Sequence, residues 1–151
     1  MEKVVRLASK HDLNSILSFW QKVDIQVDGI ESYIDNFILM EDDKRQLLAT
    51  VGFQSIQENG LLRSLVITPT LTERDILLLF QAIMGVAEEK GMSHLYLVTN
   101  KAVSVPFFQL LNFQEIEYSE LPAAIREINL IAASECEPSV CVMEHTFTKG
   151  I

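Results

Sequence analysis

Apolar residues follow two different spacings along this chain, one typical of strands and one typical of helices. Apolar or alternating runs predict strands at residues 4–7, 37–40, 46–56, 61–67, 94–100, 113–118 and 140–147. Spacings of three and four predict helices after Ser9 and after Thr72, and shorter ones at 29–36, 104–111 and 123–133. Residues 9–12 and 72–75 each have the composition of a capping box, which marks the start of a helix.

Each predicted helix has apolar residues that need a partner. The helix that begins after Thr72 ends near Gly91 and is apolar on most sides, so we expect it to be largely buried. A turn is expected at residues 58–60, and Asn112 is expected to end the helix before it in a left-handed conformation. The residues expected to face inward from the other helices are Leu13, Ile16, Leu17, Trp20 and Val23, then Ile30, Tyr33 and Ile34, and finally Phe107, Phe108, Leu110 and Leu111.

The order of these elements predicts the fold class. Neighbouring strands at 37–67 read as hairpins, whereas the strand–helix–strand order over 61–100 predicts a right-handed parallel crossover. The chain is therefore expected to be an α+β protein with a mixed central sheet of about six to seven strands and flanking helices. Its 151 residues fit a single domain, 1–151.

Charge narrows the range of partners. With 12 basic and 21 acidic residues the net charge is −9, which disfavours nucleic acid and anionic membranes. The charged run Glu41–Asp43 reads as a solvated turn. The start of the chain lacks the apolar core of a signal peptide and no apolar run could span a bilayer, so we expect a cytoplasmic protein. A homodimer is left open.

Two segments resemble the GCN5-related N-acetyltransferases (GNAT). The sequence GLLRSLVITP at 60–69 is similar to the fourth strand of that family, and FFQLLNF at 107–113 is similar to a motif near its end. The tail, at 120–126 and 136–141, resembles the branch with arsenic-resistance-associated acetyltransferases and N-acetylglutamate-synthase-like domains. The resemblance implies a small amine or amino acid as acceptor, and acetyl-CoA between the fourth and fifth strands near Val66, Ile67, Asn100 and Phe108.

The loop that holds the coenzyme's pyrophosphate in this family is poorly matched here. The pattern "[RQ]-x-x-G-x-[GA]" falls on residues 72–77, where Thr72, Asp75 and Leu77 take the three signature positions. Thr72 and Asp75 are expected to cap the helix themselves, and to use amides that a phosphate would otherwise meet. Arg74 remains as a phosphate partner, and the backbone at Ile76 belongs to the same predicted site.

The groups that could carry the chemistry are few. The position of the family's tyrosine general acid is taken by Phe108, so the catalytic group is not assigned. Arg63 and Arg126 could bind a substrate carboxylate or form ordinary ion pairs. His94 reads as an exposed strand-start residue, Cys136 and Cys141 as reduced structural thiols, and a metal site is not expected. Two functions stay open: an acetyltransferase, or an inactive protein of the same fold that binds another ligand.

Overall fold

The computed structural model describes residues 3–22, 30–32, 34–99, 105–126 and 141–147. Contacts divide the chain into two compact units. Unit 1 comprises Met1–Gln54 and Arg63–Lys90, and unit 2 comprises Ser55–Leu62 and Gly91–Ile151.

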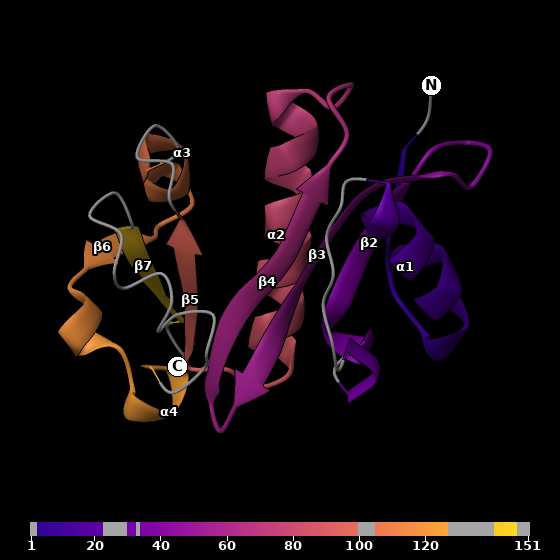
Figure 1. The fold of residues 1–151 in the computed structure, drawn as a ribbon. Helices are drawn as coiled ribbons and strands as arrows, with labels where there is room; N and C mark the ends of the chain where they lie inside the picture. The colour runs from indigo at the N-terminus through magenta and orange to yellow at the C-terminus, as the bar shows by residue number, and fades with distance from the viewer. Residues whose placement is uncertain (1–2, 23–29, 33, 100–104, 127–140, 148–151) are drawn as a thin grey trace. The chain divides into compact units, whose positions relative to one another are not determined.

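The described strands form the mixed sheet that the sequence predicts (Figure 1). Their hydrogen-bonded order is β1-β2-β3-β4-β5-β7-β6. The β4–β5 pair is parallel, whereas β1–β2, β2–β3, β5–β7 and β6–β7 are antiparallel. The α+β class and the crossover are therefore confirmed. The strands are β1 (Val4–Leu7), β2 (Phe37–Glu41), β3 (Leu47–Ile56), β4 (Asn59–Ile67), β5 (His94–Thr99), β6 (Gln114–Ile116) and β7 (Cys141–Thr146).

The helices also follow the predicted order, with shorter bounds. The α-helices are α1 (Leu13–Gln21), α2 (Glu73–Glu89), α3 (Val105–Leu110) and α4 (Ala123–Arg126). Single 3-10 turns occupy Lys10–Asp12, Ile30–Ser32, Ile34–Asn36 and Tyr118–Glu120. Within the described ranges, none of these helices has the length and apolar character needed to cross a membrane.

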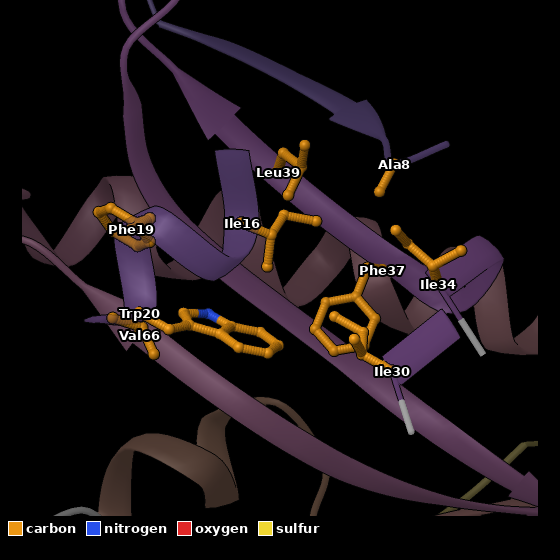
Figure 2. Close-up of a cluster of buried hydrophobic side chains, with 9 residues drawn as sticks. All are labelled: Ala8, Ile16, Phe19, Trp20, Ile30, Ile34, Phe37, Leu39 and Val66. Atoms are coloured by element: carbon orange, nitrogen blue, oxygen red, sulfur yellow. The ribbon is translucent and has the colours of Figure 1, made fainter. Parts of the chain in front are cut away.

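The core of unit 1 gathers around Trp20 of α1 (Figure 2). The indole packs at a tilt on Phe37 of β2, with ring centroids 5.7 Å apart. Its Nε1–H donates to the buried hydroxyl of Thr50, 2.9 Å away, which satisfies its polar atom inside the core. The other buried members of the cluster are Ala8, Ile16, Phe19, Ile30, Ile34, Leu39 and Val66.

Two details of the predicted α1 face are wrong. Phe19 is buried and Leu17 is 38% exposed, because the buried stripe runs through Ile16, Phe19 and Trp20 and Leu17 lies at its edge. The predicted inward positions Val23 and Tyr33 lie outside the described residues.

Strand β2 of unit 1 is buried on both faces. Phe37 and Leu39 point to the α1 cluster, so Ile38 and Met40 face the other side, and all four are at most 3% exposed. Helix α2 packs against β2. Its buried residues are Leu79, Phe80, Ile83 and Ala87, whereas Leu78 is 46% exposed. The prediction that α2 is covered on most sides is therefore wrong, because a single stripe carries its burial.

The hairpin turn before β4 lies one residue earlier than predicted. Gln57 and Glu58 form the turn, Gln57 with a φ of 59°, and Asn59 and Gly60 already belong to β4. Pairing with β5 accounts for the difference, because Asn59 and Gly60 are in register with His94 and Leu95.

In unit 2, α3 ends as the sequence predicts. Asn112 has a φ of 68°, and the amides of Asn112 and Phe113 donate to the carbonyls of Gln109 and Phe108, both at 3.0 Å. These two bonds form a Schellman motif. Phe108 and Leu111 are buried, but Leu110 is 76% exposed, so its predicted inward position is wrong. In a helix this short only one stripe can face the sheet.

In unit 2, one face of strands β5 and β7 carries an apolar cluster. Tyr96 of β5 and Val142 of β7 pack there with Leu61, Leu121 and Ile125. Strand β6 ends at Ile116, before the predicted Tyr118, whose backbone enters a 3-10 turn. Helix α4 is described as far as Arg126, and the rest of the predicted helix lies outside the described residues.

A network of charges supports the start of α1. Arg6 of β1 binds both oxygens of Asp12, at 2.9 and 2.7 Å, and its Nε donates to Glu41 at 2.7 Å. Asp12 also accepts the amide of Ser9 at 2.8 Å, as the predicted capping box requires. The hydrogen bonds from Arg6, and then from the Ser9 amide, lower the pKa of Asp12 to about 2 against the cost of burial.

This depressed pKa makes a prediction for pH dependence. Because the pKa of Asp12 is lower in the folded state, its ionised carboxylate stabilises the protein above the unfolded pKa of about 4. This stabilisation is lost as pH falls towards 2. Because Arg6 is 38% exposed, we discount the effect for solvent screening to about 1 kcal/mol. Asp12→Asn should lower the free energy of unfolding by this amount at pH 7, in urea titrations, and the difference should shrink below pH 4. The exposed Asp43→Asn is the control, and a gap that persists at pH 2 would contradict the assignment.

Candidate functional site

The start of α2 in unit 1 is capped by its own residues. The Oγ1 of Thr72 accepts the amide of Asp75 at 3.2 Å, and the Asp75 carboxylate accepts the amide of Thr72 at 3.0 Å. This is the predicted capping box. It accounts for two of the free amides of the first turn and leaves those of Glu73 and Arg74 as the amides that a ligand could reach.

A third residue completes this cap. Lys3 Nζ lies 2.8 Å from Asp75 Oδ2, and both side chains are mostly buried. The Lys3 hydrogen bond, and then the Thr72 amide, hold the pKa of Asp75 below its usual value. Lys3 neutralises the carboxylate that the sequence places against a bound phosphate. Sequence reasoning did not find Lys3, because it lies 72 positions from its partner.

The other residues predicted to contact the coenzyme differ in how exposed their side chains are. Val66 is 5% exposed and its side chain belongs to the α1 cluster (Figure 2), so this side chain is not accessible to a ligand. Ile67 is 38% exposed, Ile76 and Leu77 are half-buried, and Arg74 is exposed. Asn100 lies outside the described residues.

Phe108 in unit 2 is a core aromatic. It is 7% exposed and meets Phe107 and Phe113 edge to face, with centroids 5.5 and 6.0 Å apart. Such contacts explain its place in the fold by packing alone. It brings no ionisable proton to a leaving group.

The predicted substrate residues are not brought together by the described contacts. Arg63 belongs to β4, but its side chain lies outside the described part of the structure. Arg126 ends α4 with an exposed side chain, and its carbonyl accepts the Tyr118 hydroxyl at 3.5 Å. Their roles stay predictions.

The histidines and cysteines do not form a metal site within the described ranges. His145 Nδ1 lies 3.0 Å from the carbonyl of Asn112, which can only accept, so Nδ1 carries the proton. His94 stacks on Tyr96 with centroids 6.0 Å apart. Burial raises the pKa of the Cys141 thiol, and Glu115 raises it further, which fits an unreactive thiol. Cys136 lies outside the described residues.

Two carboxylates predicted to be solvated are buried instead. Glu41 and Asp42 are each 8% exposed. Glu41 accepts a hydrogen bond from the Arg6 guanidinium, and Asp42 accepts the amides of Lys44 and Gln46 at 2.8 and 2.9 Å. Both carboxylates therefore stabilise the local structure. These contacts, which join β1 to β2 and close the β2–β3 turn, hold the two carboxylates in buried positions.

A tyrosine–carboxylate pair in unit 2 was missed by sequence reasoning. Tyr96 of β5 lies opposite Glu144 of β7 and donates its hydroxyl hydrogen to that carboxylate. Tyr96 is 3% exposed, and burial, followed by this hydrogen bond, raises its pKa. Tyr96 is also in register with Leu61 at the last of the three described pairs of the parallel β4–β5 ladder. The alternation in β7 could have placed Glu144 on a buried face, but it could not name Tyr96 as its partner.

Comparison with known proteins gives one sequence relative and many related structures. No protein-family model matches the chain. The uncharacterized protein YwlB of Bacillus subtilis is 28% identical over 114 residues, which are 75% of this chain and 78% of that protein. N-acetylglutamate synthase from Neisseria gonorrhoeae, complexed with coenzyme A and N-acetyl-glutamate, gives a TM-score of 0.76 at 17% identity over 99% of this chain. Rv2747 from Mycobacterium tuberculosis, in complex with CoA and NLQ, gives 0.73 at 16% identity over 96% of this chain and 99% of its own.

The two solved structures differ in how much of their own length this chain covers. This chain spans 36% of the N-acetylglutamate synthase, whereas it spans nearly all of Rv2747. At such identities the likeness concerns the arrangement of helices and strands. It agrees with the mixed sheet, the parallel β4–β5 pair and the helix that starts after β4. This chain has the fold of the GNAT acetyltransferases.

Proposed function

We propose that this chain is an N-acetyltransferase that moves an acetyl group from acetyl-CoA to a small amine or amino acid. The observation that carries the proposal is the parallel β4–β5 pair, whose two strands are connected in the sequence by α2. Solved structures with this fold include complexes with CoA. One of those relatives holds N-acetyl-glutamate, which supports an amino acid acceptor. Fold alone does not specify chemistry, so the residues must supply it.

Tyr96 and Glu144 are the groups we assign to proton transfer. Acetyl transfer needs the acceptor ammonium to lose its proton before nitrogen attacks the thioester carbonyl. Glu144 is half-buried and ionisable, and Tyr96 fixes the position of its carboxylate by a hydrogen bond. In the proposed reaction Glu144 takes the first ammonium proton, the carbon–nitrogen bond forms and the carbon–sulfur bond breaks. The second proton on that nitrogen passes through water to the departing thiolate, which leaves a neutral amide and a thiol.

The α2 start is the proposed contact for the coenzyme's pyrophosphate. The amides of Glu73 and Arg74 and the exposed Arg74 side chain are the available donors. Lys3 offsets the charge of Asp75, so the remaining opposing charge is that of Glu73. The site is thus weakened relative to a glycine-rich loop, by about 1 kcal/mol for each misplaced charge.

A second function is favoured by the same cap. Thr72 and Asp75 already satisfy each other, and Phe108 offers no proton. A protein of this fold that has lost acetyl-CoA binding, and that acts by binding another ligand, would have these features. The two functions differ in whether the coenzyme binds.

A calorimetric titration with acetyl-CoA separates them. The acetyltransferase should bind acetyl-CoA, and mass spectrometry should detect acetylated products in a panel of amino acids and amines. Asp75→Gly with Leu77→Gly should strengthen binding about fivefold, because it frees the Thr72 amide and leaves the Lys3 ammonium for the pyrophosphate, a gain of about 1 kcal/mol. The control is Asp43→Gly, an exposed turn residue.

Two outcomes count against the acetyltransferase. Coenzyme affinity that exists only in the double variant would support the inactive protein with an eroded loop. Failure of both proteins to bind would contradict the proposed pyrophosphate contact as well.

A further inference from the structure

A pocket lies entirely within unit 1 and borders Thr68, in the segment that leads from β4 to α2. Residues at α1, the β2–β3 turn and the segment after β4 line a surface pocket of about 380 Å³ that is open to solvent. That volume lies within the range of small-molecule sites. Its lining includes two cations, Lys22 and Arg45, and none of the described residues that line it is acidic.

The local charge is unusual for this protein. The whole chain carries a net charge of −9, yet the two ionisable residues among the described lining of this pocket are both positive. Neither Lys22 nor Arg45 forms an ion pair with any of the residues that the structure describes. Arg45 also lines a separate pocket together with Glu41, Asp42 and Asp43.

The turn that carries Arg45 is held firmly. Asp42 accepts the amides of Lys44 and Gln46, and its own carbonyl accepts the Arg45 amide at 3.0 Å. Arg45 adopts a φ of 62°, a left-handed conformation that glycine would take at less cost. A long cation therefore occupies a position where the backbone favours a residue without a side chain.

The rest of the lining suits an oxyanion joined to an apolar group. Ser15, Ser18 and Thr68 bring hydroxyl groups, while Phe19 and Leu47 bring apolar surface. Lysine, arginine and hydroxyl donors together match the several acceptor oxygens of a phosphate better than the two of a carboxylate. The carbonyl end of α1 lies nearby and opposes an anion, so we expect weak affinity from this pocket.

We propose that this pocket binds the phosphate group of a small phosphorylated molecule, with Lys22 and Arg45 as its cationic partners. The apolar part of that molecule lies against Phe19 and Leu47. None of the described residues that line this pocket is a donor of the proposed coenzyme contact at α2. Phosphate binding in the pocket does not depend on acetyl transfer.

Amide chemical shifts on the labelled protein, titrated with inorganic phosphate and phenyl phosphate at low salt, test the proposal. Both probes should shift the amides around Ser18, Gln46 and Thr68 saturably, and phenyl phosphate should bind more tightly. Lys22→Gln and Arg45→Gln should each weaken phosphate binding about fivefold, and added salt should weaken it further. The matched control is Lys44→Gln, which removes the same charge from the neighbouring residue but does not line the pocket.

Three results would overturn the proposal. The first is the absence of saturable shifts with either phosphate probe. The second is equal weakening by Lys44→Gln, which would indicate nonspecific attraction. The third is tighter binding of benzoate than of phenyl phosphate, which would assign the pocket to carboxylates. Repeating the titration with CoA separates the two sites: an unchanged response supports an independent pocket, and competition would mean that the pocket serves the coenzyme's own phosphates.

Discussion

Replacing Glu144 with Gln is expected to lower kcat/KM for acetyl transfer by about 100-fold or more, the usual contribution of a positioned general base. Gln keeps the size of the side chain but cannot take a proton from the acceptor ammonium. Binding of acetyl-CoA should stay within about twofold of the parent protein, because the change removes proton transfer and no coenzyme contact. Steady-state kinetics and calorimetry measure the two effects separately.

The control for Glu144→Gln lies on the same sheet. Glu115 of β6 is in register with Met143, so it points to the opposite face from Glu144, where it interacts with Cys141. Glu115→Gln should leave kcat/KM nearly unchanged. Tyr96→Phe should lower kcat less than Glu144→Gln, because Tyr96 positions the carboxylate. Equal kinetics for the Glu115 and Glu144 variants would remove Glu144 from the mechanism.

Replacing Trp20 with Ala is expected to destabilise unit 1 by about 3–5 kcal/mol, the range for deleting a fully buried large aromatic side chain. Trp20 is 0% exposed, packs on Phe37 and donates to the buried Thr50 hydroxyl, so the change leaves a cavity and removes a hydrogen bond. Urea unfolding followed by circular dichroism gives the free energy of unfolding of each variant.

Leu17→Ala is the matched control on the same helix. Leu17 is 38% exposed at the edge of the buried stripe, so its loss should cost about 1 kcal/mol or less. A similar loss of stability for both variants would contradict the packing in Figure 2. The contrast also tests the register of α1, which the sequence pattern alone placed incorrectly at Leu17 and Phe19.

The elements with local causes were predictable from the sequence. The capping boxes at Ser9 and Thr72 involve residues three apart, and the stop at Asn112 needs only its own left-handed conformation. The parallel crossover followed from a helix placed between two apolar strands. Each of these features depends on interactions within one or two neighbouring elements.

Long-range contacts were not predictable in the same way. Lys3 and Asp75 are 72 positions apart, and Arg6 and Glu41 are 35 apart. The sequence determined that Asp75 would cap α2, but only the tertiary structure decided that Lys3 would neutralise it. Likewise, the sequence places Glu144 in an alternating strand, whereas the register between β5 and β7 decides that Tyr96 lies opposite it. Strand register is fixed by the burial of whole faces, so a single sequence determines the elements and the folded chain decides which of their side chains meet.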